Sequence, residues 1–207
     1  LIDYLNSIGV EKNHAEILER FSYGTFIGDK HNFLYVETPK CACSSMKKIV
    51  ARLEGFEIEE MQVGEESSPK MSIHKRKYHP LESLNTLSKE NIKRIMHDDL
   101  YVRFCVVRNP YARLASAWSD KIRQMEPTHL QVIEEIQDYH NISDRFRTPS
   151  FEQFVLWVVN RDENLECDAH WESMLNLLLP DLIHYTDVLK TESLEADFQI
   201  VLGKLGV

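Results

Sequence analysis

Two segments of this sequence each have the pattern of a strand that passes through a short turn into a helix. They are FLYVETPKCACSSMKKIV at residues 33–50 and VRFCVVRNPYARLASAWSDKI at residues 102–122. In both, a run of strand-forming residues ends close to a proline, and apolar residues then recur at helical spacing. Because strands that alternate with helices form layered structures, the pattern favours an α/β fold with a mainly parallel sheet.

Further elements are expected around these two segments. The polar stretch 57–80 is expected to be a loop. We expect one domain over residues 1–207, since a chain of this length can bury roughly 70% of its unfolded surface. The other predicted elements are a weak helix within 4–22, a helix capped by Ser88, a helix behind a Ser150–Gln153 capping box, a short third strand at 182–185 and a terminal helix over 194–206.

Composition narrows the classes of function. The formal net charge of −9 argues against non-specific nucleic-acid binding, so no nucleic-acid partner is expected, although a local pocket can still attract an anion. No apolar run reaches the ~18 residues of a membrane span, and no signal peptide is visible. The four cysteines are too sparse and uneven for a disulfide scaffold, which favours a reducing compartment.

The first turn has the features of an anion site. A strand that turns into a helix aims several backbone N–H groups at one point, and the helix dipole adds about half a positive charge there. Lys40 adds a full positive charge at the mouth of the turn, and Ser44 and Ser45 add hydroxyl donors. The Walker pattern is absent, which disfavours a nucleoside triphosphatase. A plain strand–helix connection with a surface lysine and capping serines is the alternative.

The second turn offers a second anion site. Arg108 stands at the end of the strand, Pro110 suits the first turn of a helix, and Ser116 lies two turns in. Arginine presents a planar fork suited to phosphate, although Arg108 could instead pair with a core carboxylate. Two phosphate sites on neighbouring strands suit a nucleotide that carries two separate phosphates.

These motifs resemble those of the sulfotransferases that use 3′-phosphoadenosine 5′-phosphosulfate (PAPS), in particular the carbohydrate sulfotransferases of the Golgi and their bacterial relatives. PKCACSSMKK is similar to the 5′-phosphosulfate loop of this family, and FCVVRNPYARLASAWSDKI is similar to its 3′-phosphate motif. DAHWESMLNLLLPDLIHYTDVLKTESLEADFQIVLGKLG resembles its C-terminal segment. The resemblance spans residues 33–206 and implies a P-loop-like three-layer fold with a mainly parallel central sheet flanked by helices.

The resemblance also implies a donor substrate and site residues. PAPS would be the donor and adenosine 3′,5′-bisphosphate the product, with no metal required. Arg108 and Ser116 would bind the 3′-phosphate, and Lys40 would also act in catalysis by stabilising the leaving oxygen. The glycine-free turn is expected to keep ordinary backbone dihedrals, as small Ala42 and Cys43 permit, while Asn109 replaces the commoner Asp of the family. The residues implied to bind the 5′-phosphosulfate are Lys40, Cys41, Ala42, Cys43, Ser44 and Ser45.

Transfer to a hydroxyl needs a general base, most often a histidine, whose pKa lies near neutrality. His74 is the preferred candidate, because its I-H-x-R stretch is similar to bacterial relatives and lies in a loop able to fold over the site. His79 and His170 are alternatives, and His170 belongs to an HW pair that could bind substrate or pack structurally. Glu37, at the end of the first strand, is a non-histidine candidate.

Several functions stay open at this point. A carbohydrate or another hydroxyl-bearing molecule is the expected acceptor, and the sequence indicates no oligomeric state. A nucleotide kinase-like phosphotransferase and a PAPS-binding module without catalysis are alternatives, and Cys41, Cys43, Cys167 and His170 could form a structural zinc site. The bacterial cytoplasm is the favoured location, with the Golgi lumen as the alternative if an anchor preceded Leu1.

Overall fold

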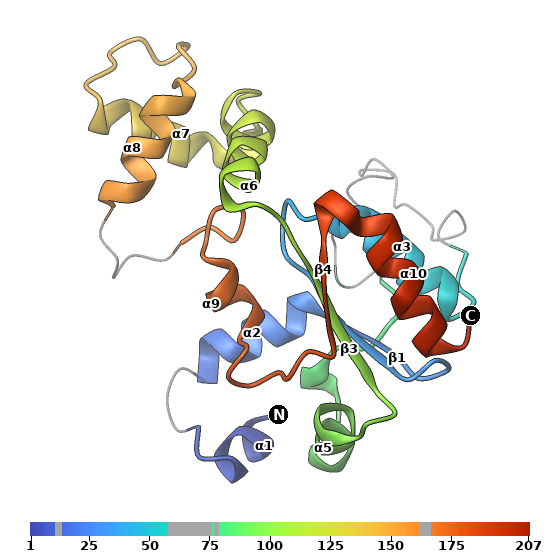
Figure 1. Cartoon of the computed structure of the whole chain (residues 1–207). Helices are drawn as coiled ribbons and strands as arrows, with labels where there is room; N and C mark the ends of the chain where they lie inside the picture. Colours follow the sequence, from blue (N-terminus) through green and yellow to red (C-terminus); the bar gives the residue numbers. More distant parts are fainter. Residues whose placement is uncertain (11–13, 58–75, 77–78, 162–166) are drawn as a thin grey trace. The chain divides into compact units, whose positions relative to one another are not determined.

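The computed structural model describes residues 1–10, 14–57, 76, 79–161 and 167–207, and Figure 1 traces the chain. The chain divides into two compact units, each with its own hydrophobic core. Unit 1 comprises residues 1–107 and 174–207, and unit 2 comprises residues 108–173. A single domain over the whole chain stays a prediction. Most of the expected loop at 57–80 lies outside the described residues, and so does His74.

Unit 1 is built around a four-stranded sheet in the order β1-β2-β3-β4. β2 and β4 each pair in parallel with β3, whereas β1 pairs antiparallel with β2. The α/β fold with a mainly parallel sheet is therefore confirmed. Because β2 and β3 run in parallel, their carboxyl ends lie at the same edge of the sheet. The strands are β1 (Thr25–Gly28), β2 (Phe33–Val36), β3 (Val102–Val107) and β4 (Asp187–Lys190).

The last strand does not lie where the sequence pattern placed it, so the prediction of a strand at 182–185 is wrong. The N–H groups of Leu182 and Ile183 both bond to the carbonyl of Leu179, at 2.9 and 3.0 Å, so this run begins in a turn, and it pairs with no strand that the structure describes. β4 follows as DVLK, and Leu189 is its one buried residue. An edge strand with a single buried side chain gives little hydrophobic pattern in the sequence. The sequence analysis also missed β1, which is buried throughout but has only four residues.

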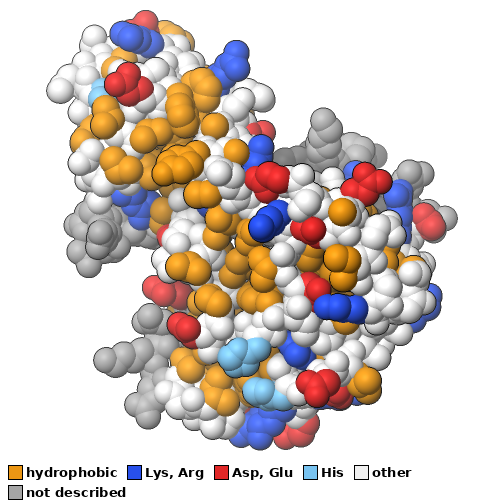
Figure 2. All heavy atoms as spheres, in the orientation of Figure 1, with side chains coloured by type: hydrophobic (Ala, Val, Ile, Leu, Met, Phe, Trp, Pro, Cys, Tyr) orange, Lys and Arg blue, Asp and Glu red, His pale blue; other side chains and the backbone are white. Residues whose placement is uncertain are grey.

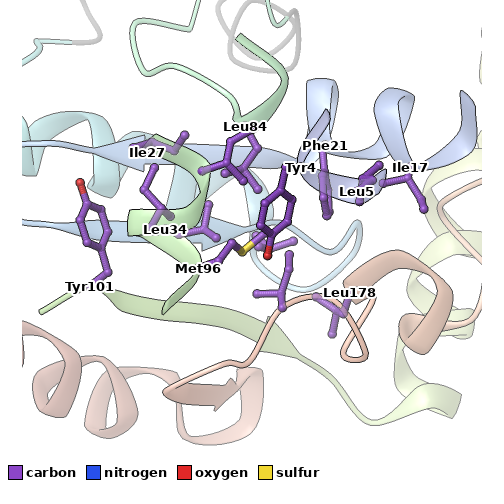
Figure 3. Close-up of a cluster of buried hydrophobic side chains, with 14 of the residues drawn as sticks. Tyr4, Leu5, Ile17, Phe21, Ile27, Leu34, Leu84, Met96, Tyr101 and Leu178 are labelled. Atoms are coloured by element: carbon purple, nitrogen blue, oxygen red, sulfur yellow. The ribbon is translucent and has the colours of Figure 1, made fainter. Parts of the chain in front are cut away.

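Side chains of the sheet alternate between two hydrophobic clusters, one on each face. Phe33 and Tyr35 belong to the cluster that includes α3 and α10, whereas Leu34 and Val36 belong to the cluster that includes α1, α2 and α5. Figure 3 shows the second of these clusters. Helices thus cover both faces of the sheet, which confirms the three-layer arrangement. The helices are α1 (Ile2–Ser7), α2 (His14–Gly24), α3 (Cys43–Leu53), α5 (Lys89–His97) and α10 (Leu194–Leu205).

Local sequence signals account for the ends of these helices. Ser88 caps α5 as predicted, accepting a 3.3 Å hydrogen bond from the N–H of Asn91. The predicted terminal helix is α10, which ends at Gly206 with a φ of 74°, in the left-handed region where glycine is favoured. The short elements of unit 1 are η3 (Leu84–Thr86), α9 (Met174–Leu178) and η6 (Thr191–Ser193).

Unit 2 is helical, and its core is a cluster of buried residues that includes Ile133, Phe154 and Trp171. The predicted capping box is present, since Ser150 accepts from the N–H of Gln153 while the Gln153 side chain accepts from the N–H of Ser150. The elements are α6 (Pro110–Ala117), the π-helix η4 (Trp118–Ile122), η5 (Pro127–His129), α7 (Leu130–Tyr139) and α8 (Phe151–Asn160).

The surface of unit 2 carries large hydrophobic side chains as well as charged ones. Tyr139 of α7 is 48% exposed and Val159 of α8 is 67% exposed. Figure 2 shows hydrophobic side chains gathered over this part of the chain on the face in view. Within the described ranges of both units, no helix has the length and apolar character needed to cross a membrane.

Candidate functional site

The turn after β2 holds two non-glycine residues in the left-handed backbone region. Lys40 has a φ of 67° and Ala42 a φ of 57°. The expectation that this glycine-free turn keeps ordinary dihedrals is therefore wrong. A left-handed conformation costs a non-glycine residue roughly 1–2 kcal/mol, and such strain persists only where the surroundings impose it. Turns of this kind direct successive backbone N–H groups into a concave anion site.

The start of α3 provides the second part of an anion site. Ala42 is the N-cap and has no side-chain acceptor, so neither Ser44 nor Ser45 caps this helix, although the alternative of a plain strand–helix connection required such a cap. Both serines lie instead in the first turn, where Ser44 is half-buried and Ser45 is exposed. The N–H groups of a first turn have no intrahelical acceptor, and the helix dipole makes this end positive. Backbone donors, hydroxyls and Lys40 therefore meet in one short segment.

A buried hydroxyl at the entrance of the turn also suits a polar ligand. The Oγ1 atom of Thr38 is buried, and it has no hydrogen-bond partner among the described residues. A buried polar atom without a partner costs free energy, so it favours a ligand or an ordered water that can accept from it. The donor set of Thr38, Lys40 and the start of α3 fits a phosphate or sulfate group, because every member can donate a hydrogen bond.

A buried ion pair connects the two ends of the turn. The Nζ atom of Lys47 in α3 lies 2.5 Å from Oε2 of Glu37, the residue after β2, and both side chains are at most 2% exposed. The Lys47 ammonium also lies 5.1 Å from the ring centroid of Tyr23 and 5.5 Å from that of Phe26. Removing one member of such a pair leaves an uncompensated buried charge. The pair therefore holds the end of β2 and the first turns of α3 in one arrangement.

Sequence reasoning missed this pair, although a signal for it was present. Met46, Val50 and Ala51 form the buried stripe of α3, and Lys47 lies within that stripe. A lysine on the apolar face of a helix needs a buried anion, and Glu37 is the carboxylate at the end of the preceding strand. Because Oε2 of Glu37 is engaged by Lys47, the residue is better explained as an anchor of the turn than as a general base.

Arg20 of α2 completes the support of the turn. Its guanidinium donates to the carbonyl oxygen of Glu37 and, at 2.5 Å, to that of Leu177. A Cβ atom added to Gly24 would lie 2.2 Å from Nη1 of Arg20, so a larger residue at this position would displace the guanidinium from these contacts. Burial lowers the pKa of Arg20, but the nearby Glu37 carboxylate opposes that shift.

The cysteines of the turn are suited to packing rather than to metal binding. Cys41 is fully buried in the cluster between the sheet and α3. Burial, followed by the charge of Glu37, raises the pKa of the Cys43 thiol. Metal ligation requires thiolates, so this environment disfavours the zinc site that Cys41 and Cys43 could otherwise form.

The second turn enters its helix in the ordinary way. Arg108 follows the last residue of β3 and is half-buried. Asn109 is the N-cap of α6, and its Oδ1 accepts from the N–H groups of Tyr111 and Ala112 at 3.0 and 3.2 Å. Pro110 occupies the first helical position, as predicted. Asn109 thus performs the capping role that an Asp would perform at the same position.

The two polar residues further along α6 differ in their surroundings. Arg113 is buried and donates to the carbonyl oxygens of Ala169 and Glu172, both at 2.7 Å. It therefore connects α6 to the 169–172 segment of unit 2. Ser116 lies one turn later and is half-buried.

The described histidine candidates for the general base are both engaged by other protein groups. His79 is 7% exposed, with Nε2 3.2 Å from the carbonyl oxygen of Lys47, and its Nδ1 accepts from the N–H of Leu81 at 3.3 Å. Burial lowers its pKa to about 4, and the nearby cations Arg76 and Lys47 add to the shift. Both contacts suit a neutral ring with a structural role rather than a general base. His170 has Nδ1 2.6 Å from Oδ1 of Asp168 in unit 2.

Comparisons with known proteins identify a family to which the chain is similar. The family model described as "Sulfotransferase family" matches residues 23–207. Carbohydrate sulfotransferase 10 of Mus musculus is 29% identical over 94% of this chain and 56% of its own length. Carbohydrate sulfotransferase 11 of Rattus norvegicus is 31% identical over 87% and 52%, and carbohydrate sulfotransferase 9 of Homo sapiens is 27% identical over 100% and 46%. The chain thus spans about half the length of these relatives, and no solved structure matches it.

Proposed function

Because the chain belongs to the sulfotransferase family, we propose that it transfers the sulfuryl group of PAPS to a hydroxyl of a carbohydrate. The observation that carries this proposal is the strained turn between β2 and α3. Lys40 and Ala42 have left-handed conformations in the segment between Glu37 and Lys47, which form a buried ion pair, and this segment follows the carboxyl end of a parallel strand. Ligands bind at this end of the strands in open α/β sheets.

The donor would be held by two groups of residues. Lys40, Cys41, Ala42, Cys43, Ser44 and Ser45 bind its 5′-phosphosulfate through backbone N–H groups, hydroxyls and the Lys40 ammonium. Arg108, which follows β3, binds its 3′-phosphate together with Ser116. The parallel pairing of β2 with β3 supports this assignment, since the two motifs follow neighbouring strand ends. Thr38 adds a buried hydroxyl at the first group.

The proposed chemistry is a direct, in-line transfer. When bound, PAPS supplies the sulfuryl group and a phosphate leaving group. Lys40 and the N–H groups at the start of α3 stabilise the negative charge that develops on the leaving oxygen. His74 accepts the proton of the attacking acceptor hydroxyl. We retain His74 in this role because both ring nitrogens of His79 contact backbone groups and because His170 contacts Asp168.

The acceptor and the compartment follow from the relatives. Their names specify carbohydrate sulfotransferases, so we propose a carbohydrate acceptor for this chain. These relatives are mammalian, which supports the Golgi lumen over the bacterial cytoplasm, the location first expected from the sequence. Asn141 of the Asn141-Ile142-Ser143 triplet is exposed and accessible to glycosylation in that compartment. A glycosidase-sensitive mobility shift of protein expressed in animal cells, absent in Asn141→Gln, would support lumenal passage; unshifted protein retained in the cytosol would contradict it.

A transfer assay tests the proposed function. Purified protein is incubated with sulfur-labelled PAPS and with unsulfated chondroitin or a neutral glycan, and label in the glycan is measured. We expect transfer to at least one glycan, with kcat about 10²–10⁴-fold lower in His74→Ala and unchanged in the control His184→Ala, whose side chain is exposed. Donor binding without transfer to any hydroxyl acceptor would support a non-catalytic module instead. Label transfer from ATP–Mg²⁺ rather than from PAPS would support a kinase-like enzyme.

A further inference from the structure

Unit 2 contains a cluster of two histidines and one aspartate that the proposed function does not use. His129 is the last residue of η5, and Asp168 and His170 lie in the segment that precedes α9. The Asp168 carboxylate contacts both rings, with Oδ2 3.1 Å from Nε2 of His129 and Oδ1 2.6 Å from Nδ1 of His170. The chain thus brings together residues 39 positions apart around one carboxylate.

The spacing of these atoms suits a metal ion. One ligand atom from each of the three residues lies within 4.8 Å of the others. Ligand atoms bound to one zinc ion at 2.0–2.2 Å lie roughly 3–3.5 Å apart in tetrahedral geometry, so a small adjustment of side chains brings this set around an ion. Two imidazoles and one carboxylate also match the ligand types that zinc and similar first-row cations prefer.

The surroundings hold the ligands in place. Oε2 of Glu126 lies 2.9 Å from Nδ1 of His129, so a carboxylate fixes the ring and leaves Nε2 directed at the cluster. A carboxylate behind a metal-binding histidine is the usual arrangement, because it orients the ring and increases its basicity. His129 is buried, and its ring lies 5.9 Å from the ring of Trp171 in the core of unit 2.

The segment that carries the other two ligands is also fixed. The Arg113 guanidinium donates to the carbonyl oxygens of Ala169 and Glu172, on either side of His170. The N–H of His170 donates to Oδ1 of Asp168 at 2.8 Å, which closes a compact turn around the carboxylate. The His170 side chain is 29% exposed, so a cation and its remaining ligands can reach the cluster from solvent.

We propose that His129, Asp168 and His170 bind one divalent cation of the zinc class, with water completing the coordination. The ion joins η5 to the 168–170 segment, so its binding stabilises the folded form of unit 2. The site is separate from the residues proposed to bind PAPS, and it assigns the ion no part in sulfuryl transfer. A cluster held together only by hydrogen bonds is the competing explanation, and it predicts no stoichiometric metal.

Metal binding to the purified chain tests this proposal. Protein without a histidine tag is stripped with a chelator, titrated with Zn²⁺ by calorimetry, and separately loaded with Co²⁺ for its visible spectrum. We expect one Zn²⁺ per chain with micromolar or tighter affinity, a higher Tm when zinc is present, and the intense absorption of four-coordinate Co²⁺. No binding, or binding without a rise in Tm, would overturn the proposal.

Variants locate the site. His170→Ala and the isosteric Asp168→Asn should each weaken zinc binding at least 100-fold and abolish the rise in Tm, while circular dichroism shows that they fold. The control His140→Asn changes another half-buried histidine of unit 2, whose Nε2 contacts the carbonyl oxygen of Gln153, and should bind zinc as the parent does. Equal zinc affinity in Asp168→Asn, His170→Ala and the parent would place the metal elsewhere and refute the assignment.

Discussion

The two strand–turn–helix segments follow neighbouring parallel strands, yet they enter their helices by different means. After β2, the chain passes through left-handed Lys40 and Ala42 and starts α3 without a side-chain cap, and the buried Glu37–Lys47 pair joins the two ends of this segment. After β3, Asn109 caps α6 through two hydrogen bonds and Pro110 fits the first turn without strain.

If both turns bind phosphate as proposed, the difference predicts that they do so by different means. In the first turn the backbone N–H groups would donate to the anion, the helix dipole would add to the attraction, and the buried Glu37–Lys47 pair would keep the backbone in place. In the second turn the helix entry is ordinary, so binding would depend on a side chain, Arg108. Anion binding at the first turn should therefore be sensitive to loss of the Glu37–Lys47 pair, whereas anion binding at the second turn should be sensitive to substitution of Arg108.

The largest expected loss of stability comes from removing the buried Glu37–Lys47 pair beside the first turn. Lys47→Met leaves Glu37 as an unpaired buried anion, so the free energy of unfolding should fall by about 3–5 kcal/mol in urea denaturation. The matched control Lys48→Met changes the exposed neighbouring lysine and should alter it by less than about 0.5 kcal/mol. The double variant Glu37→Gln/Lys47→Met should recover part of the loss. Equal stability of the two lysine variants would refute the buried pair as an anchor.

The free energy of unfolding should fall at acidic pH because of His79, whose ring contacts the carbonyl oxygen of Lys47. The pKa of His79 is about 4 in the folded chain and ~6.5 when unfolded, so the unfolded state binds more protons between these values. The stability that this neutral ring contributes is therefore present above pH 6.5 and is lost as the pH falls toward 4. Between pH 7 and pH 5 the loss should be about 2 kcal/mol. Urea unfolding at both pH values should show a shallower decline in His79→Gln; an identical decline would exclude His79 as its source.

The second turn should respond to loss of its cap. Asn109→Ala removes the acceptor for two N–H groups of α6, so the free energy of unfolding should fall by about 1 kcal/mol, whereas Asn109→Asp should preserve it. Chemical denaturation of the three proteins gives these values. A loss in Asn109→Asp as large as in Asn109→Ala would show that capping does not explain this position.

The smallest expected change in stability comes from relieving the backbone strain at Ala42. Ala42→Gly relieves the positive φ but adds unfolded-state entropy, so its free energy of unfolding should stay within about 1 kcal/mol of the parent, in the direction of higher stability. The control Ala115→Gly lies within α6 and should lose about 0.5–1 kcal/mol. If both glycine variants lose the same stability, Ala42 is not strained.

Much of unit 1 could be predicted from the sequence. β2 and β3 were predictable because FLYV and VRFCVV are buried almost throughout. The cap at Ser88, like the capping box at Ser150 in unit 2, was predictable because each lies within a few residues of its partner. β4 was not, because Leu189 is its one buried residue and a more apolar run precedes it.

The location of the candidate site in the sequence could be predicted, but its backbone conformation and its buried contacts could not. Lys40 and the serines indicated the first turn. Its left-handed backbone could not be predicted, because the residues with positive φ are Lys40 and Ala42 and no glycine is present to indicate that conformation. The Glu37–Lys47 pair depends on which face of α3 meets the sheet. His129 and Asp168 are brought together only by the folding of unit 2, so no local pattern connects them.

The proposed function requires that the two turns bind the two phosphates of one nucleotide. Calorimetry of adenosine 3′,5′-bisphosphate, 5′-AMP and 3′-AMP against the parent, Lys40→Ala and Arg108→Ala tests it most directly. Lys40→Ala should weaken the bisphosphate and 5′-AMP by roughly 10–100-fold and spare 3′-AMP, while Arg108→Ala should weaken the bisphosphate and 3′-AMP and spare 5′-AMP. A bisphosphate that binds no more tightly than either monophosphate, or variants that weaken all three ligands alike, would contradict the account.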